Sequence, residues 1–233
     1  MMISVIIPVY NEEGVIGKTV KYLKTVSDSD NLKEIIVVDG GSHDNSADEA
    51  EKEGALVIRS ARKGRAAQMN EGARIAKGTI LYFLHADSIP PASFPSDITR
   101  AVTTGYPMGC YRLRFDLHHW FLKANTWFTR FDVNAFRYGD QSLFVTRDVF
   151  RKAGGYCNKH IVMEDYEIIK RLRRHGRFII LPKEIITSAR KYVANGVFKM
   201  QGIFYLMYFM YHIGYSQKKL LAIFRKLVRQ DKL

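Results

Sequence analysis

The sequence predicts an α/β protein with a mainly parallel central sheet, flanking helices and a C-terminal helical tail. Three observations predict this class. Apolar runs of strand length alternate with segments of helical periodicity over residues 4–87. Two of these runs end in an aspartate, at Asp39 and at Asp87. Beyond residue 190 the composition becomes apolar, aromatic and basic, which separates a tail of residues 191–233 from a domain of residues 1–190.

The composition is that of a globular protein with a strongly basic charge. The 233 residues are 47% hydrophobic and 25% charged, and the formal net charge is +13. Such an excess of cations favours phosphate-bearing partners, namely nucleotides, anionic lipids or nucleic acids. Cys110 and Cys157 show neither metal-ligand spacing nor a disulfide framework, which is typical of a reducing compartment. No basic segment precedes the first apolar run, so we expect no cleaved signal peptide and a cytoplasmic protein.

The first half of the chain is predicted to alternate buried strands with helices. The strand at 79–87 is the most informative, because ligands of open α/β sheets bind beyond the carboxyl ends of the strands. Asp87 at its end is suited to a divalent cation, although an aspartate before Ser88 and Pro90 also commonly caps a turn. Neither a dinucleotide-binding glycine motif nor a Walker A motif is present. The other predicted strands are 4–10, 34–39 and 55–58, and the predicted helices are 15–24, 45–52 and 62–77.

The second half is less regular. A helix begins near Met163 with acidic residues in its first turn, where the helix dipole favours them whatever their function. Pro182 closes a predicted edge strand at 178–182, since proline cannot donate to a central ladder. The aromatic residues of 118–136 are either plain core or the wall of an acceptor site. The remaining predicted elements are helices at 94–104 and 147–153 and strands at 109–115 and 139–145.

Six short motifs, in this order and spacing, resemble those of family 2 glycosyltransferases. Each motif is weak alone, and together they span about residues 3–190. The resemblance implies the GT-A fold of nucleotide-diphospho-sugar transferases, with a nucleotide-binding half at 1–88 and an acceptor and catalytic half at 89–190. The motifs are Pro8-Val9-Tyr10-Asn11-Glu12, Val38-Asp39-Gly40-Gly41-Ser42, Lys63-Gly64 with Asn70-Glu71-Gly72-Ala73, His85-Ala86-Asp87, Gly139-Asp140-Gln141 and Glu164-Asp165.

The resemblance also implies a role for each matching position. Asp87 would ligate a divalent cation, Mn²⁺ or Mg²⁺, which holds the diphosphate of a nucleotide-sugar donor. Asp165 would be the general base that takes the proton of the acceptor hydroxyl, with Glu164 as a further catalytic candidate. Donor and nucleotide binding is implied for Pro8, Tyr10, Glu12, Asp39, Lys63, Gly64, Arg65 and His85, and acceptor binding for Gly139, Asp140 and Gln141.

Several of these positions keep more than one interpretation. His85 stands where the family has the first Asp of its Asp-x-Asp motif, and it would ligate Mn²⁺, contact the ribose or diphosphate, or only pack. Glu164 is either catalytic or simply a favourable acid at a helix N-terminus. Arg62, Lys63 and Arg65 either contact the donor or form a solvated basic face. The Gln-x-x-Arg-Trp motif of processive members is missing, which favours the transfer of one sugar at a time.

The tail combines an apolar segment with a basic amphipathic helix. The uninterrupted apolar part of 197–213 is shorter than the roughly 20 residues that span a bilayer. From Ser216 onwards, apolar residues and cations fall on opposite helical faces, a pattern typical of a helix lying in a membrane interface. A helix docked on its own domain would show the same apolar stripe. The apolar face is Leu220, Ile223, Phe224, Leu227 and Val228, and the basic face is Lys218, Lys219, Arg225, Lys226 and Arg229.

The resemblance implies an inverting glycosyltransferase, and together with the other observations it predicts a non-processive enzyme at the cytoplasmic face of a membrane. It would move a sugar from a nucleotide-sugar donor to an acceptor hydroxyl on a sugar, a membrane lipid or a membrane-proximal glycan, with an anionic membrane surface as a peripheral partner. Two alternatives stay open, a nucleotidyltransferase on a related sheet and a basic nucleic-acid-binding protein. The glycine-rich basic loop that nucleotidyltransferases carry after the first strand is missing from this sequence. No nucleic-acid-binding motif supports the second, so no nucleic acid partner is expected.

Overall fold

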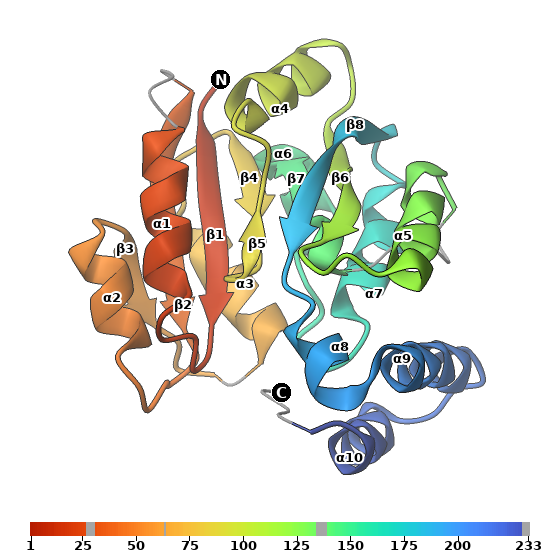
Figure 1. The fold of residues 1–233 in the computed structure, drawn as a ribbon. Coiled ribbons are helices and arrows are strands. Elements are labelled where there is room, and N and C mark those ends of the chain that lie inside the picture. The colour runs from red at the N-terminus through yellow and green to blue at the C-terminus, as the bar shows by residue number, and fades with distance from the viewer. Residues whose placement is uncertain (27–30, 63, 134–138, 230–233) are drawn as a thin grey trace.

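The computed structural model describes residues 1–26, 31–62, 64–133 and 139–229, which fold around one mixed sheet (Figure 1). Lys63, a predicted donor-binding residue, lies outside the described residues, as does the end of the aromatic segment at 134–136. The strands of this sheet are β1 (Ile3–Val9), β2 (Leu32–Asp39), β3 (Leu56–Arg59), β4 (Ile80–Phe83), β5 (Ser88–Ile89), β6 (Met108–Phe115), β7 (Leu143–Thr146) and β8 (Phe178–Thr187).

The strand order is β3-β2-β1-β4-β7-β6-β8-β5, and the predicted α/β class is confirmed. The first four strands of this order are parallel to one another, as is the pair of β6 and β8. β4 with β7, β6 with β7 and β5 with β8 are antiparallel. Because β1, β2 and β4 run in one direction, their carboxyl ends meet at the same edge of the sheet.

Helices cover both faces of the sheet, because its central strands are apolar on both sides. The helices are α1 (Ile16–Thr25), α2 (Ser46–Lys52), α3 (Arg65–Ile75), α4 (Phe94–Thr103), α5 (Trp120–Trp127), α6 (Arg147–Lys152), α7 (Glu164–Leu172), α8 (Arg190–Asn195), α9 (Val197–His212) and α10 (Gln217–Leu227), with short 3-10 turns η1 (Phe128–Arg130) and η3 (Gly139–Gln141). In β1, Val5 and Ile7 belong to a buried cluster with α1, α2 and α4. Ile6 between them belongs to a second cluster with α3, α6 and α7. Alternate side chains of one strand therefore fill two separate cores.

β4 is shorter than predicted, because it ends at Phe83 rather than at Asp87. Leu84 still donates its N–H to the carbonyl of Ile6 at 3.0 Å, and the chain then turns. The turn leads into β5, which pairs with the last two residues of β8. His85 and Asp87 consequently lie on a turn beyond the strand, where their side chains are available to a site.

Two predicted strand boundaries are also wrong. The first three residues of the predicted strand at 139–145 form η3, and Ser142 adopts a left-handed φ of 61° before β7 begins. β8 continues past Pro182 to Thr187 because the register shifts there: Tyr111 of β6 pairs with Leu181, and the next residue of β6 pairs with Glu184. Pro182 is thus opposite no residue of β6, so its missing N–H breaks no ladder bond.

The tail helices pack on the protein itself. Leu220, Phe224 and Val228 of the predicted amphipathic helix are buried in a third cluster, which contains Met200 and Met207 of α9. Of the two interpretations of α10, the structure supports the helix docked on its own chain. None of the described helices is both long enough and apolar enough to cross a membrane.

Candidate active site

The loops that follow β1 and β2 are tied together at the carboxyl edge of the sheet. The backbone N–H of Asn11 donates to Oγ of Ser42 at 2.9 Å. Asp39, buried at the end of β2, accepts from the N–H groups of Gly41 at 3.2 Å and Ser42 at 3.1 Å. Its carboxylate therefore orders this loop, and its contact with a nucleotide base stays a prediction.

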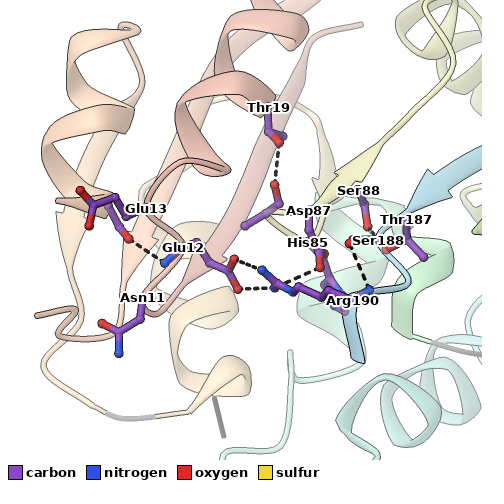
Figure 2. A network of polar contacts seen from close by, with 12 residues as sticks. Asn11, Glu12, Glu13, Thr19, His85, Asp87, Ser88, Thr187, Ser188 and Arg190 are labelled. Atoms are coloured by element: carbon purple, nitrogen blue, oxygen red, sulfur yellow. Dashed lines mark hydrogen bonds and ion pairs between the residues drawn. The ribbon is translucent and has the colours of Figure 1, made fainter. Parts of the chain in front are cut away.

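Arg190, the first residue of α8, connects the two halves of the chain (Figure 2). Its guanidinium donates to both carboxylate oxygens of Glu12, from Nη1 to Oε2 at 2.6 Å and from Nη2 to Oε1 at 2.5 Å. Nη2 also lies 3.0 Å from Oδ2 of Asp87. Glu12 is buried, and its backbone N–H donates to Oγ of Ser46 at 2.7 Å. One arginine thus fixes the two carboxylates for which donor and metal binding were predicted.

His85 lies next to Asp140 of η3, with 3.0 Å between Nδ1 and Oδ1. Burial alone would raise the pKa of Asp140, but the hydrogen bond and charge of His85 outweigh it and lower this pKa to about 2. Burial alone would lower the pKa of His85, and the hydrogen bond to Asp140 reverses this, so the pKa is raised. Each group therefore favours the charged form of the other, and a role of His85 toward metal or donor stays a prediction.

Arg65 and Glu164 begin two helices, α3 and α7, and face each other with 2.7 Å between Nε and Oε1. Glu164 is buried, and burial raises its pKa against the opposing effect of Arg65. Asp165 is only half-buried, with Oδ1 3.5 Å from the hydroxyl of Tyr156. Because Glu164 is already held by a guanidinium, the more open Asp165 is the better placed of the two to accept a proton.

Charges from both halves of the chain gather around Arg65. Burial would lower its pKa, but neighbouring carboxylates raise it; they are those of Glu164, Asp165, Asp140 and Asp87. The pKa of Asp87 is raised by burial and then by Asp140, against the effect of Arg190. Lys191 belongs to the same set, since burial and Arg65 lower its pKa while Asp140 and Asp87 oppose them. The site is therefore a compact set of carboxylates and cations rather than a single pair.

Pro8, Tyr10 and Gly64 lie in or next to the ends of β1 and α3, and donor binding by them stays a prediction. Pro8 is the second-last residue of β1. The pairing of β1 with β4 ends at Ile6, so Pro8 interrupts no hydrogen bond between these two strands. Tyr10 is half-buried directly after β1. Gly64 precedes α3 with a φ of 108°, a conformation that glycine adopts readily and other residues rarely do.

The predicted acceptor residues of η3 have different environments. Asp140 lies in the site, where its carboxylate pairs with His85. Gln141 is buried and donates from Nε2 to the carbonyl of Tyr111 in β6 at 3.1 Å. Gly139 is the first residue of η3. The side chain of Gln141 therefore anchors η3 to the sheet, and acceptor binding by these three residues stays a prediction.

Arg190, Lys191 and Gln68 stand in none of the six sequence motifs. Gln68 of α3 is buried and donates from Nε2 to the carbonyls of Val9 at 2.8 Å and Val38 at 2.7 Å, which joins the ends of β1 and β2. Arg190 and Lys191 stand at the composition change that was interpreted as a domain border. Their positive charge is the one signal in the sequence that could have indicated them. That signal is weak, because the chain contains 36 lysines and arginines.

A divalent cation fits this site only in part. Within the described residues, no three His, Cys, Asp or Glu side chains are grouped so as to hold a metal ion. Asp87 does offer the hard oxygen atoms that Mn²⁺ and Mg²⁺ accept. Burial and Asp140 disfavour its negative charge, which a cation would compensate. The residues fit a cation shared between Asp87 and a bound diphosphate, and not a cage made by protein alone.

Comparison with known sequences identifies relatives. Residues 4–156, more than half of the chain, match the model of glycosyl transferase family 2. The undecaprenyl-phosphate 4-deoxy-4-formamido-L-arabinose transferase of Proteus mirabilis is 28% identical over 200 residues, which cover 81% of this chain and 57% of that protein. Glycosyltransferase AglE of Haloferax volcanii is 26% identical over 201 residues, which cover 79% of this chain and 65% of that protein. The chain spans less than two thirds of the length of these relatives.

Comparison with solved structures identifies the fold. The mannosyltransferase PcManGT of Pyrobaculum calidifontis, solved in complex with GDP-Man and Mn²⁺, superimposes with a TM-score of 0.69 at 18% identity, covering 88% of this chain and 61% of that one. TarS of S. aureus, solved with UDP, gives a TM-score of 0.69 at 15% identity, covering 81% and 61%. These likenesses show a GT-A fold, as the resemblance implied. With its fold and its matching residues 4–156, the chain belongs to glycosyltransferase family 2.

Proposed function

We propose that the protein transfers one sugar at a time, with inversion, from a nucleotide-sugar donor to an acceptor hydroxyl. One observation carries the proposal: carboxylates from both halves of the chain share a single site with partly buried cations. Glu12 and Asp87 come from the first half, and Asp140 and Asp165 from the second. Family membership favours this reaction over the nucleotidyltransferase and the nucleic-acid-binding protein.

The cations of the site suit the departing nucleoside diphosphate. Arg65, Arg190 and Lys191 are at least partly buried, and each interacts with Asp87. Cations fixed in a site of low polarity stabilise negative charge that develops as the sugar leaves. A divalent cation bound at Asp87 would add Lewis-acid stabilisation of the same charge. The Mn²⁺ in the structure of PcManGT supports a cation of this kind.

Asp165 is the proposed general base. It stands at the start of α7 and is more open than Glu164, which Arg65 holds. In a single displacement the acceptor oxygen attacks the anomeric carbon from the side opposite the leaving group, and Asp165 takes the hydroxyl proton. Glu164 would act through Arg65, by fixing the guanidinium beside the other carboxylates.

The proposed acceptor is carried by a membrane lipid or lies close to the cytoplasmic face of a membrane. The support is the similarity to a relative named as an undecaprenyl-phosphate transferase. We therefore also propose a peripheral protein at this surface, with the chain's high positive charge as the attraction to anionic lipid.

Product analysis tests the proposed reaction. The protein is incubated with nucleotide sugars, Mn²⁺ and lipid-linked or simple sugar acceptors, and the release of nucleoside diphosphate is followed. We expect a product carrying one added sugar, with the anomeric configuration opposite to that of the donor when measured by proton NMR. Retention of configuration would contradict inversion, and a ladder of longer products would contradict single transfer. A matched incubation with the Asp165→Asn variant serves as the control.

A further inference from the structure

Helices α5 and α9 are neighbours (Figure 1). Both carry large apolar side chains that are exposed to solvent. Ring centroids of Phe121 and Phe198 are 4.9 Å apart, and the hydroxyl of Tyr205 donates to Oδ1 of Asn125 at 2.8 Å, which joins the two helices. Six residues, here named the aromatic face, have exposed fractions between 46% and 70%. They are Trp120, Trp127, Phe198, Tyr205, Phe209 and Ile213.

The helical spacing places the members of the aromatic face together. Trp120 and Trp127 are two turns apart on the same side of α5. Positions 198, 205, 209 and 213 likewise fall on one side of α9 and of the turn that ends it. The opposite side of α9, with Met200, Ile203 and Met207, is buried in the cluster that includes α10. α9 thus carries apolar side chains on two opposite sides, and among the residues that the structure describes only the side with Met200 is buried. Exposed apolar surface of this kind marks an interaction site.

We propose that the aromatic face docks on an anionic lipid bilayer. Tryptophan and tyrosine are the side chains enriched at the boundary between lipid and water, because each combines an apolar ring with a polar atom. Neither α5 nor α9 contains an acidic residue. Lys123 on α5 and Lys199 on α9 are exposed among the apolar residues. This surface is therefore apolar and positive, which complements anionic lipid headgroups better than the mixed charges of a typical protein partner.

In this proposal α5 and α9 enter the lipid, whereas the sequence pattern indicated α10. The apolar stripe of α10 packs in the third cluster, with Leu220, Phe224 and Val228 buried, so this stripe is used within the protein. α10 would contribute to membrane binding through its charge. Its exposed cations are Lys218, Lys219, Arg225 and Lys226. Arg190 of the site begins the short helix that leads directly into α9, so docking would hold the site near the membrane. The biological purpose of the docking, delivery to a membrane-borne acceptor, rests on the proposed function. Lipid binding itself does not depend on sugar transfer.

The two tryptophans of the chain report on the aromatic face directly, because both belong to it. The full chain is mixed with vesicles of phosphatidylcholine alone or with added phosphatidylglycerol, and sedimentation and tryptophan emission are followed. We expect sedimentation with the anionic vesicles, a blue shift of the emission and protection from a water-soluble quencher. Sedimentation with unchanged emission would mean binding through another surface and would overturn the proposal. A blue shift that grows with protein concentration in the absence of vesicles would identify a second copy as the partner instead.

A pair of substitutions tests the apolar contribution. The double variant Phe209→Ser with Ile213→Ser changes two exposed side chains and should fold as the parent does. Its affinity for anionic vesicles should fall about tenfold or more, since burial of such side chains is lost. Leu56→Ser, at an exposed position of β3 on the far edge of the sheet, is the matched control and should bind vesicles as the parent does. Equal binding by all three proteins would overturn the proposal. Donor binding and sugar transfer to a soluble acceptor are measured separately, so a failure there would count against the proposed function alone.

Discussion

Arg190 and Asp87, far apart in the sequence, lie 3.0 Å apart between Nη2 and Oδ2, and the same guanidinium holds Glu12. Asp87 comes from the turn after β4, and Arg190 comes from the first residue of α8. The contact therefore joins the sheet edge to the start of the tail, at the point where composition predicted a border between them. By its contacts, α8 is part of the site.

The Arg190→Gln variant should be less stable than the parent. Removal of the guanidinium leaves the buried carboxylate of Glu12 without its bidentate partner, and hydrogen bonds to charged groups contribute about 1.5–3 kcal/mol. Urea unfolding monitored by circular dichroism gives the difference in free energy of unfolding. Arg62→Gln, at an exposed arginine, is the control and should change it little. A combined Glu12→Gln and Arg190→Gln variant should recover part of the loss; no recovery would contradict the pairing as the cause.

The Asp165→Asn variant should bind donor normally and transfer sugar slowly. The amide keeps the shape of the side chain but cannot accept a proton, and loss of a general base typically costs about 10²–10⁴ in rate. Single-turnover transfer and donor titration measure the two effects separately. Asp148→Asn, at an exposed acid of α6, should leave both unchanged. Near-parental transfer by Asp165→Asn would move the role of base to Glu164 or Asp140.

The stability that His85 and Asp140 give each other should depend on pH, when measured without divalent cations. The pKa of His85 is raised, so its contribution is complete below the unfolded value of about 6.5 and is lost as pH rises through the raised value. The pKa of Asp140 is lowered, so its contribution is present above the ordinary value of 3.8 and is lost as pH falls through about 2. The difference in unfolding free energy between the parent and His85→Gln should therefore be largest between these two limits, at about pH 4–6.5. A difference that stays constant from acid to alkaline pH would contradict this pairing.

The Asp87→Asn variant should lose most of the metal-dependent part of its affinity for nucleoside diphosphates. An amide oxygen is a weaker ligand of Mn²⁺ than a carboxylate oxygen, whereas the cations Arg65 and Lys191 remain in place. Isothermal titration of UDP and GDP, with Mn²⁺ and with a chelator, separates the two parts. If parent and variant show the same dependence on Mn²⁺, then Asp87 is a turn residue without a role in metal binding.

The order of strands and helices could be predicted in the first half of the chain, because apolar runs of strand length alternate there with helical patterns. The ends of elements could not be predicted so well, because tertiary contacts decide them. β4 stops at Phe83 because the next residues turn toward β8, and β8 passes Pro182 because the register shifts beside Tyr111. Neither partner strand is adjacent in the sequence, so local patterns carry no sign of either event.

The carboxylates of the candidate site and Arg65 could be named from the sequence, but Arg190 and Lys191 could not. Asp87, Asp140 and Asp165 stand in recognisable motifs, whereas Arg190 and Gln68 act through contacts between distant segments. The apolar stripe of α10 was visible in the sequence, but a stripe does not reveal whether protein or lipid covers it. Burial of Phe224 shows that protein covers the stripe of α10, whereas α5 and α9 expose apolar side chains.

Thermal unfolding with a panel of nucleotide sugars tests most directly whether the two halves of the chain form one nucleotide-sugar site. A ligand that binds only the folded chain adds about 2.7 kcal/mol of stability at a hundredfold excess over its Kd. We expect at least one nucleotide sugar, and the nucleoside diphosphate it contains, to raise the Tm of the parent in the presence of Mn²⁺. The rise should be smaller in Asp87→Asn and in Arg190→Gln, relative to the Tm of each variant alone. No rise with any donor or diphosphate at saturating concentrations, or an equal rise in all three proteins, would contradict a nucleotide-sugar site at Asp87 and Arg190.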